Sequence, residues 1–125
     1  MIRPLRVLHV EDDNDIHQIL RTVAGQTINF MQVTTLADAR SAIRLEPFDV
    51  IILDVKLPDG VGMELMKDIS QLQANARVIV FSGDEAASEN VLGVEAVLLK
   101  SLVSMDDVIK SIKSQIIPTN KDVSL

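Results

Sequence analysis

The stretch from Val50 to Gly60 reads VIILDVKLPDG, and the rest of the chain is best understood from it. Four apolar residues, three of them β-branched, run directly into Asp54, and the sequence Pro58, Asp59, Gly60 then signals a turn. A short apolar run closed by a turn predicts a strand that is buried on both faces. Asp54 then lies at the carboxyl end of a buried strand, the edge of an open α/β sheet where ligands bind. Taken alone, this carboxylate is slightly better explained as a strand-end cap than as a chemical group.

The composition limits the class of protein. A chain of 125 residues suits one domain with a substantial core, and its 47% hydrophobic but only 2% aromatic content means that aliphatic side chains build that core. The net charge of −6 argues against direct binding to nucleic acid or to an anionic membrane, and the lack of cysteine excludes disulfides and thiolate metal sites. There is no apolar signal core and no run of about 20 apolar residues, so we expect a cytoplasmic protein without membrane contact.

Apolar patterns predict five strands that alternate with five helices. The strands are expected at residues 6–10, 30–34, 50–53, 78–81 and 97–99. Asp13 or Asn14, Thr35 and Ser104 are expected to cap the first, second and fifth helices, and the fourth helix, within residues 85–92, is expected to be short or irregular. This alternation predicts a doubly wound, flavodoxin-like parallel sheet in the order 2-1-3-4-5, with its switch point between strands one and three. We assign residues 1–118 to this domain and residues 119–125 to a flexible C-terminal tail.

The spacing of apolar residues predicts which face of each helix is buried. In the first helix the predicted inner face is Ile16, Ile19, Leu20 and Val23. The third helix has Leu65, Met66, Ile69 and Leu72, and the fifth has Met105, Val108, Ile109, Ile112 and Ile116. His9 lies inside a buried strand and is expected to be a core histidine with a satisfied ring, whereas His17 is expected to face solvent.

Polar residues follow four of the predicted strands at the point where each strand ends. The residues are Glu11, Asp12 and Asp13, then Asp54, Ser82 and Lys100. Because the carboxyl ends of parallel strands share one edge, these groups should converge at the switch point. Oxygen ligands suit Mg²⁺, and a carboxylate can attack a phosphoryl group to give an aspartyl phosphate. An ammonium and a hydroxyl then stabilise the transferring oxygens. This convergence favours a chemical role for Asp54 over a cap.

At this point the sequence resembles the receiver domain of two-component response regulators. The resemblance covers residues 6 to about 116, and its motifs are VEDD (10–13), IILDVKLPDG (51–60), VIVFSG (78–83) and VLLKS (97–101). It implies that Asp54 accepts a phosphoryl group from a sensor histidine kinase or a histidine phosphotransfer protein. In such a phosphorelay the signal passes to an unknown downstream protein by conformational change or protein interaction. The chain would then be a phosphoacceptor and not an enzyme.

The resemblance also implies the roles of the surrounding residues. Mg²⁺ would be the cofactor, bound directly by Asp12 and Asp54, through water by Glu11, and by the backbone carbonyl of Lys56. Ser82 would donate a hydrogen bond to the phosphoryl group, and Lys100 would pair with it. Lys56 and Asp84 occupy the positions that tune autodephosphorylation in this family.

Three departures from the family pattern lie on the side that most receivers use for output. Val97 stands where receivers usually carry an aromatic switch residue, and Ser101 stands where a proline usually follows a cis peptide bond. A cis bond before a non-proline residue costs about 2.5–4 kcal/mol, so we expect either a trans bond with a displaced loop or a strained cis bond. The segment from Ser82 to Lys100 is shorter than the family norm by roughly one helical turn of 3.6 residues.

Other functions remain open to test. The departures favour, as the alternative, a degenerate receiver that binds a protein without phosphorylation. A second alternative is a phosphohydrolase of the haloacid dehalogenase type, a class with a D-x-D motif after its first strand. Here Lys56, and not an aspartate, stands two residues after Asp54. Flavin binding is disfavoured because the acidic residues 11–13 would repel a phosphate. The resemblance leaves a homodimer open, since receivers often dimerise near the fifth helix.

Overall fold

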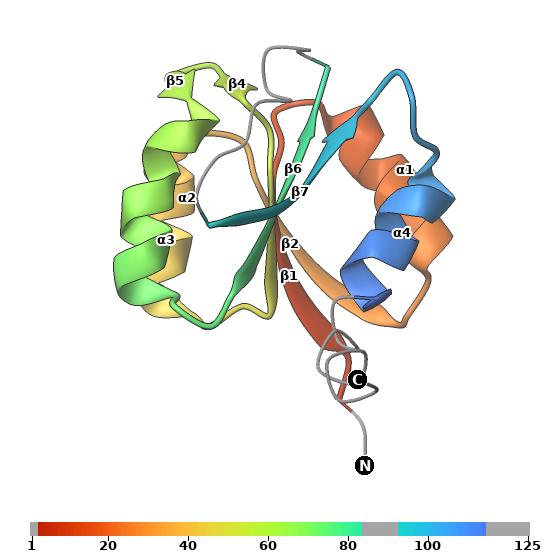
Figure 1. Cartoon of the computed structure of the whole chain (residues 1–125), viewed down its shortest axis with the longest axis horizontal. Helices are drawn as coiled ribbons and strands as arrows, with labels where there is room; N and C mark the ends of the chain where they lie inside the picture. The colour runs from red at the N-terminus through yellow and green to blue at the C-terminus, as the bar shows by residue number, and fades with distance from the viewer. Residues whose placement is uncertain (1–2, 84–92, 115–125) are drawn as a thin grey trace, which may run out of the picture.

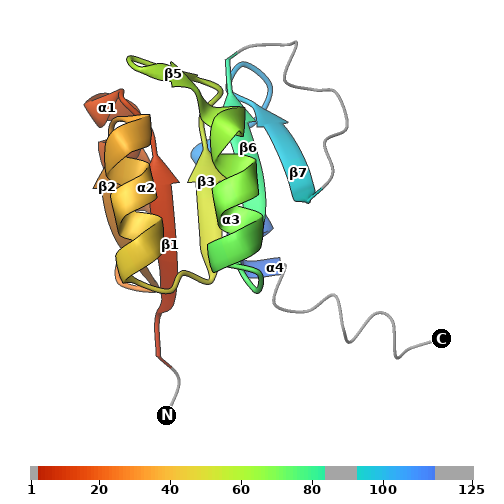
Figure 2. The same ribbon diagram turned by 90° about the vertical axis from the view of Figure 1, so that its left-hand side faces the viewer.

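The computed structural model describes residues 3–83 and 93–114. Its centre is a five-stranded parallel sheet in the order β2-β1-β3-β6-β7, which confirms the predicted order (Figures 1 and 2). The strands are β1 (Leu5–Val10), β2 (Ile28–Val33), β3 (Val50–Leu53), β6 (Arg77–Ser82) and β7 (Val94–Leu99). The helices are α1 (Asn14–Ala24), α2 (Leu36–Leu45), α3 (Met66–Leu72) and α4 (Met105–Ser114), with a 3₁₀ helix, η1 (Gly62–Leu65), before α3. The expected helix within residues 85–92 lies outside the described residues.

Helices cover both faces of the sheet. Helices α2 and α3 lie side by side on one face, and α1 and α4 cover the other (Figures 1 and 2). Alternate residues of each strand therefore enter different cores, as Leu8 and Ile51 do on the α2–α3 side and Val7 and Ile52 do on the α1–α4 side. All four residues of β3 are fully buried, so the apolar run before Asp54 is the central strand that its sequence predicts.

The helix ends follow the predicted capping chemistry. Asp13 caps α1 by accepting hydrogen bonds from the backbone N–H groups of Asp15 and Ile16. Thr35 caps α2. The Ser104 hydroxyl accepts a hydrogen bond from the backbone N–H of Asp107, whose carboxylate accepts one from the Ser104 N–H in return. These caps fix where each helix leaves the sheet edge.

The inner face of α1 differs from the predicted one. The buried residues are His17, Leu20 and Ala24, whereas Ile19 is 51% exposed and Val23 is 42% exposed. The prediction that His17 faces solvent is therefore wrong, because its ring packs inward against His9. Leu72 of α3, also predicted to face inward, is 52% exposed. In α4 the prediction is confirmed for Val108, Ile109 and Ile112, and Ile116 lies outside the described residues.

A small hairpin, which the sequence does not predict, joins β3 to η1. It consists of β4 (Lys56–Leu57) and β5 (Gly60–Val61). Asp59 lies in the turn of this hairpin, and its carboxylate accepts hydrogen bonds from the backbone N–H groups of Leu36, at 2.8 Å, and Ala37, at 3.1 Å. These bonds lower the pKa of Asp59 and tie the hairpin to the amino end of α2. The loop that follows Asp54 is thereby attached to the scaffold.

The opposite end of the sheet is closed by the buried side chain of Gln73. Its amide nitrogen donates to the carbonyls of Ile43, at 2.9 Å, and Glu46, at 2.6 Å. Its amide oxygen accepts from the backbone N–H of Phe48, at 3.1 Å. This one side chain satisfies backbone groups at the end of α2 and in the connection to β3. None of the helices in residues 3–83 and 93–114 has the length and apolar character needed to cross a membrane.

Candidate functional site

The polar residues predicted to converge do meet in one open cleft at the carboxyl ends of the strands. The cleft has a volume of about 630 Å³. Its lining includes every candidate site residue predicted from the sequence, namely Glu11, Asp12, Asp54, Lys56, Ser82 and Lys100, together with Asp13, Ile16 and Gly83. Strands β1, β3, β6 and β7 therefore each deliver side chains to the same place, as the parallel topology requires.

Backbone hydrogen bonds extend the sheet into the site and fix its acidic residues. The N–H of Asp54 donates to the Val10 carbonyl at 3.1 Å, and the N–H of Glu11 donates to the Val33 carbonyl at 2.9 Å. Asp54 is only 7% exposed and Glu11 only 1%, whereas Asp12 is exposed. The acids are thus placed by the register of rigid strands, and two of them are largely withdrawn from water.

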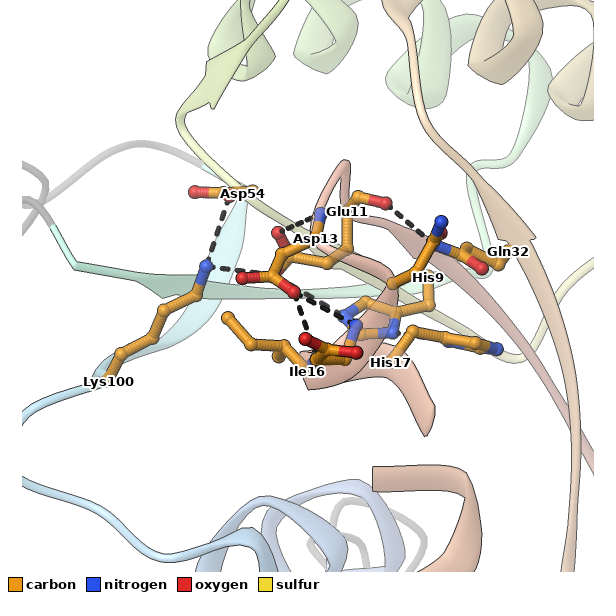
Figure 3. Close-up of polar contacts among 10 residues, drawn as sticks. His9, Glu11, Asp13, Ile16, His17, Gln32, Asp54 and Lys100 are labelled. Carbon is orange, nitrogen blue, oxygen red and sulfur yellow. Dashed lines mark hydrogen bonds and ion pairs between the residues drawn. The ribbon is translucent and has the colours of Figure 1, made fainter. Parts of the chain in front are cut away.

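The Lys100 ammonium lies between these two buried carboxylates. Its Nζ atom is 2.8 Å from Oε1 of Glu11 and 3.1 Å from Oδ2 of Asp54 (Figure 3). Burial opposes the charge of Lys100, but the hydrogen bond that it donates to Glu11 and the charges of both acids raise its pKa overall. The ammonium therefore stays protonated at neutral pH, where it can neutralise an anion in the cleft.

The three acids form a group with the geometry of a cation site. One carboxylate oxygen from each of Glu11, Asp12 and Asp54 lies within 4.8 Å of the others. Burial raises the pKa of Glu11 to about 7, an effect that Lys100 opposes and the charge of Asp54 reinforces. A donor set made only of carboxylate oxygens matches a hard divalent cation that keeps part of its water shell. The residues therefore fit a metal ion of this class.

Comparison with known proteins then identifies the family. A protein-family model of the response regulator receiver domain matches residues 7–113. The chain belongs to the response regulator receiver domain family. The transcriptional regulatory protein KdpE of Escherichia coli is 35% identical over 91 residues, which are 72% of this chain and 40% of KdpE. The response regulator ARR11 of Arabidopsis thaliana is 34% identical over 96 residues, 73% of this chain and 18% of ARR11. The chain thus spans less than half of each of these relatives.

Solved structures agree with this assignment. A signal receiver domain from Vibrio parahaemolyticus is 26% identical and superposes with a TM-score of 0.82 over 98% of each chain. A CheY-like receiver domain from Methanospirillum hungatei superposes with a TM-score of 0.79 at 22% identity and covers 96% of this chain and 99% of that one. At such low identity the second likeness concerns the fold alone.

This receiver has Val97 and Ser101 in place of the aromatic residue and the proline that receivers usually carry near the lysine, and the site forms without them. No peptide bond in the described residues is cis, so Lys100 and Ser101 are joined by a trans bond and the strained cis alternative is wrong. Lys100 is positioned instead by its backbone N–H, which donates to the Ser82 carbonyl at 2.9 Å. Val97 is partly buried in β7, paired with Val80. Asp84, predicted to tune autodephosphorylation, lies outside the described residues.

The sequence analysis did not predict that His9 and His17, which lie next to the site, form a polar group. The Nδ1 atoms of His9 and His17 are 2.9 Å apart, and Nε2 of His9 is 4.0 Å from Oε1 of Glu11. Burial, with smaller contributions from His17 and Lys100, lowers the pKa of His9 to about 3, and burial also lowers the pKa of His17. A signal was present in the sequence, since a histidine in a buried strand needs a partner and the next helix offers one.

Proposed function

We propose that this receiver domain accepts a phosphoryl group on Asp54 in a reaction that depends on Mg²⁺. The observation that carries the proposal is the placement of the buried Asp54 carboxylate at 3.1 Å from the Lys100 ammonium, beside two further acids in an open cleft. A strand-end cap would need neither the ammonium nor the additional acids. Together, the carboxylates and the ammonium match what the transfer of a phosphoryl group requires.

In the proposed reaction a carboxylate oxygen of Asp54 attacks the phosphorus of a phosphohistidine. The new P–O bond forms as the P–N bond breaks, and the imidazole nitrogen of the donor leaves with the electron pair of that bond and takes up a proton. Lys100 already contacts Oδ2 of Asp54, so its ammonium lies close to where negative charge collects on the phosphoryl oxygens. Ser82, buried at the end of β6 and lining the same cleft, is the proposed hydroxyl donor to that group.

Glu11, Asp12 and Asp54 are the proposed carboxylate ligands of Mg²⁺, with Glu11 acting through water. The backbone carbonyl of Lys56 is proposed to complete the protein ligands, since Lys56 lines the cleft at the start of β4. When bound, Mg²⁺ supplies positive charge to the phosphoryl oxygens and offsets the repulsion among the acids. The exposed side of the cleft at Asp12 leaves room for the water ligands that this ion retains.

The proposed donor is a sensor histidine kinase or a histidine phosphotransfer protein, and the output is an interaction with a downstream protein. In this proposal residues 1–118 form the receiver domain. The domain acts as a phosphoacceptor and not as an enzyme with turnover of its own, beyond assisting its own phosphorylation and dephosphorylation.

The decisive experiment is intact-mass spectrometry after incubation with Mg²⁺ and acetyl phosphate. We expect a gain of one phosphoryl group that is lost when Mg²⁺ is removed by chelation and lost in Asp54→Asn. Asp38→Asn serves as the control, since Asp38 lies on α2 away from the cleft, and it should be phosphorylated like the wild type. Failure with acetyl phosphate and also with a phosphorylated histidine kinase would reject the proposal and favour a binding module that does not use phosphorylation.

A further inference from the structure

The buried pair of His9 and His17 has no part in the proposed phosphoryl transfer, yet it touches the site. His9 is on β1, two residues before Glu11, and is 1% exposed, and His17 is on α1 and 7% exposed. The rings pack at 5.1 Å between centroids, and Phe30 of β2 closes the group with its ring edge to face against His17 at 5.9 Å. Figure 3 shows Lys100, Glu11, His9 and His17 as one continuous series of contacts.

The short contact between the two rings constrains where their protons lie. Each neutral imidazole carries one N–H, and two Nδ1 atoms at 2.9 Å form a hydrogen bond only when one of them is protonated. Both rings are buried and face apolar neighbours such as Phe30, which disfavours the charged imidazolium form. Two arrangements are therefore possible for the pair, and they differ in whether Nε2 of His9, the nitrogen that faces Glu11, carries a proton.

The surroundings of Glu11 select between these arrangements. Nε2 of His9 lies 4.0 Å from Oε1 of Glu11, the same oxygen that Lys100 contacts at 2.8 Å. If His9 carried its proton on Nδ1, a lone pair on Nε2 would face a carboxylate oxygen across a dry contact, which is repulsive. If His17 supplies the Nδ1 proton, the N–H of His9 lies on Nε2 and presents its positive end to Glu11.

We propose that His17 keeps His9 in the tautomer whose Nε2–H faces Glu11, and that this pair positions the Glu11 carboxylate for Mg²⁺ and Lys100. Both histidines are positioning residues, because they act through Glu11. The other oxygen of Glu11 accepts the backbone N–H of Asp13 at 3.2 Å, so the carboxylate is oriented from two sides. The functional part of this inference rests on the proposed Mg²⁺-dependent function, whereas the tautomer does not.

The first test measures the tautomer directly by ¹⁵N NMR of the imidazole rings at pH 7.5 without Mg²⁺, on protein free of any histidine tag. The chain has only two histidines, so the variant His17→Asn assigns both sets of signals. We expect an N–H on Nε2 and a bare Nδ1 in His9, and an N–H on Nδ1 in His17. An N–H on Nδ1 of His9, or free exchange between tautomers, overturns the inference.

The second test measures the dissociation constant of Mg²⁺ by isothermal titration calorimetry. His17→Phe keeps a ring but removes the donor to His9, and we expect binding to weaken about tenfold, as for loss of other groups that orient metal ligands. His17→Asn restores an N–H donor near the position of Nδ1 and should bind within about threefold of the wild type by the same comparison. The control Ile112→Val disturbs the same core without a polar change and should leave binding unaltered.

The outcomes separate this inference from the proposed function. If the wild type binds Mg²⁺ and His17→Phe binds it equally well, the positioning role is wrong and the proposed function stands. If Ile112→Val weakens binding as much as His17→Phe, the effect is one of general packing and the inference is also rejected. If the wild type binds no Mg²⁺, the proposed function and the positioning role both fail, and only the tautomer assignment survives.

Discussion

A single methyl group added at Gly62 tests how the loop after Asp54 is built. A Cβ atom there would lie 1.8 Å from the backbone carbonyl oxygen of Asp54 and 3.0 Å from its carbonyl carbon. Carbon and oxygen atoms normally approach to about 3.3 Å, so the two backbones must separate by about 1.5 Å. Separation is resisted because the N–H of Gly62 donates to the Val55 carbonyl at 2.6 Å. We expect Gly62→Ala to lower the free energy of unfolding by about 3 kcal/mol, the upper end for overpacking, and to slow phosphorylation of Asp54.

The assay is urea denaturation followed by far-UV circular dichroism, since the chain has no tryptophan or tyrosine to report by fluorescence. With an m-value of about 1–3 kcal/mol/M, the midpoint should fall by about 1 M or more. Gly83→Ala is the matched control, because a Cβ at Gly83 meets nothing within 4 Å and its φ is not positive. That variant should keep or slightly raise the midpoint. Equal midpoints for Gly62→Ala and the wild type would refute this account of the loop.

Three further outcomes are expected. Lys100→Met removes the ammonium that contacts Glu11 and Asp54 and should slow phosphorylation by acetyl phosphate about 10²-fold in an intact-mass time course; an unchanged rate would contradict its role. Gln73→Leu leaves two buried backbone groups and one half-buried one without their partner and should cost about 2–3 kcal/mol in urea denaturation while Asp54 is phosphorylated at the normal rate. The pKa of His9 is about 3 in the folded chain against 6.5 in the unfolded chain. Below pH 6.5 the unfolded chain therefore binds a proton that the folded chain does not, and the free energy of unfolding decreases as the pH is lowered. Between pH 7.5 and pH 5 this loss is about 2 kcal/mol, and His9→Leu should lose less over that interval in the same assay.

The strand order and the residues of the cleft could be predicted because both depend on local pattern plus one rule of topology. The apolar run before Asp54 is buried on both faces whatever packs against it, and a parallel sheet brings all carboxyl strand ends to one edge. Lys100 and Glu11 therefore meet although they lie 89 positions apart in the sequence. No knowledge of side-chain packing was needed for that step.

The inner face of α1 and the β4–β5 hairpin were not predicted, because both depend on contacts between elements that are distant in the sequence or in different parts of the fold. In α1 the apolar period selects Ile19 and Val23, yet the helix is rotated so that His17 faces the core. A scale that counts histidine as polar cannot find this rotation, because the burial of His17 depends on its hydrogen bond with His9. The β4–β5 hairpin was missed for a related reason. Its strands have two residues each, too few for a period, and Asp59 anchors it to α2 by contacts distant in sequence.

The contacts that hold Lys100 in the site do not involve the residues at which this receiver departs from the family pattern. Its backbone is held by pairing of β7 with β6, where Leu99 lies opposite Ser82, and by the hydrogen bond from its own N–H to the Ser82 carbonyl. Both constraints lie before residue 101, so the trans bond that follows leaves Nζ 3.1 Å from Asp54 and 2.8 Å from Glu11. Val97, in turn, contributes to the register of β7 but does not line the cleft. Val97 and Ser101 are therefore not among the contacts that place the Lys100 ammonium, and the proposed phosphoryl acceptance depends on the strand ends that bring Glu11, Asp54 and Lys100 together.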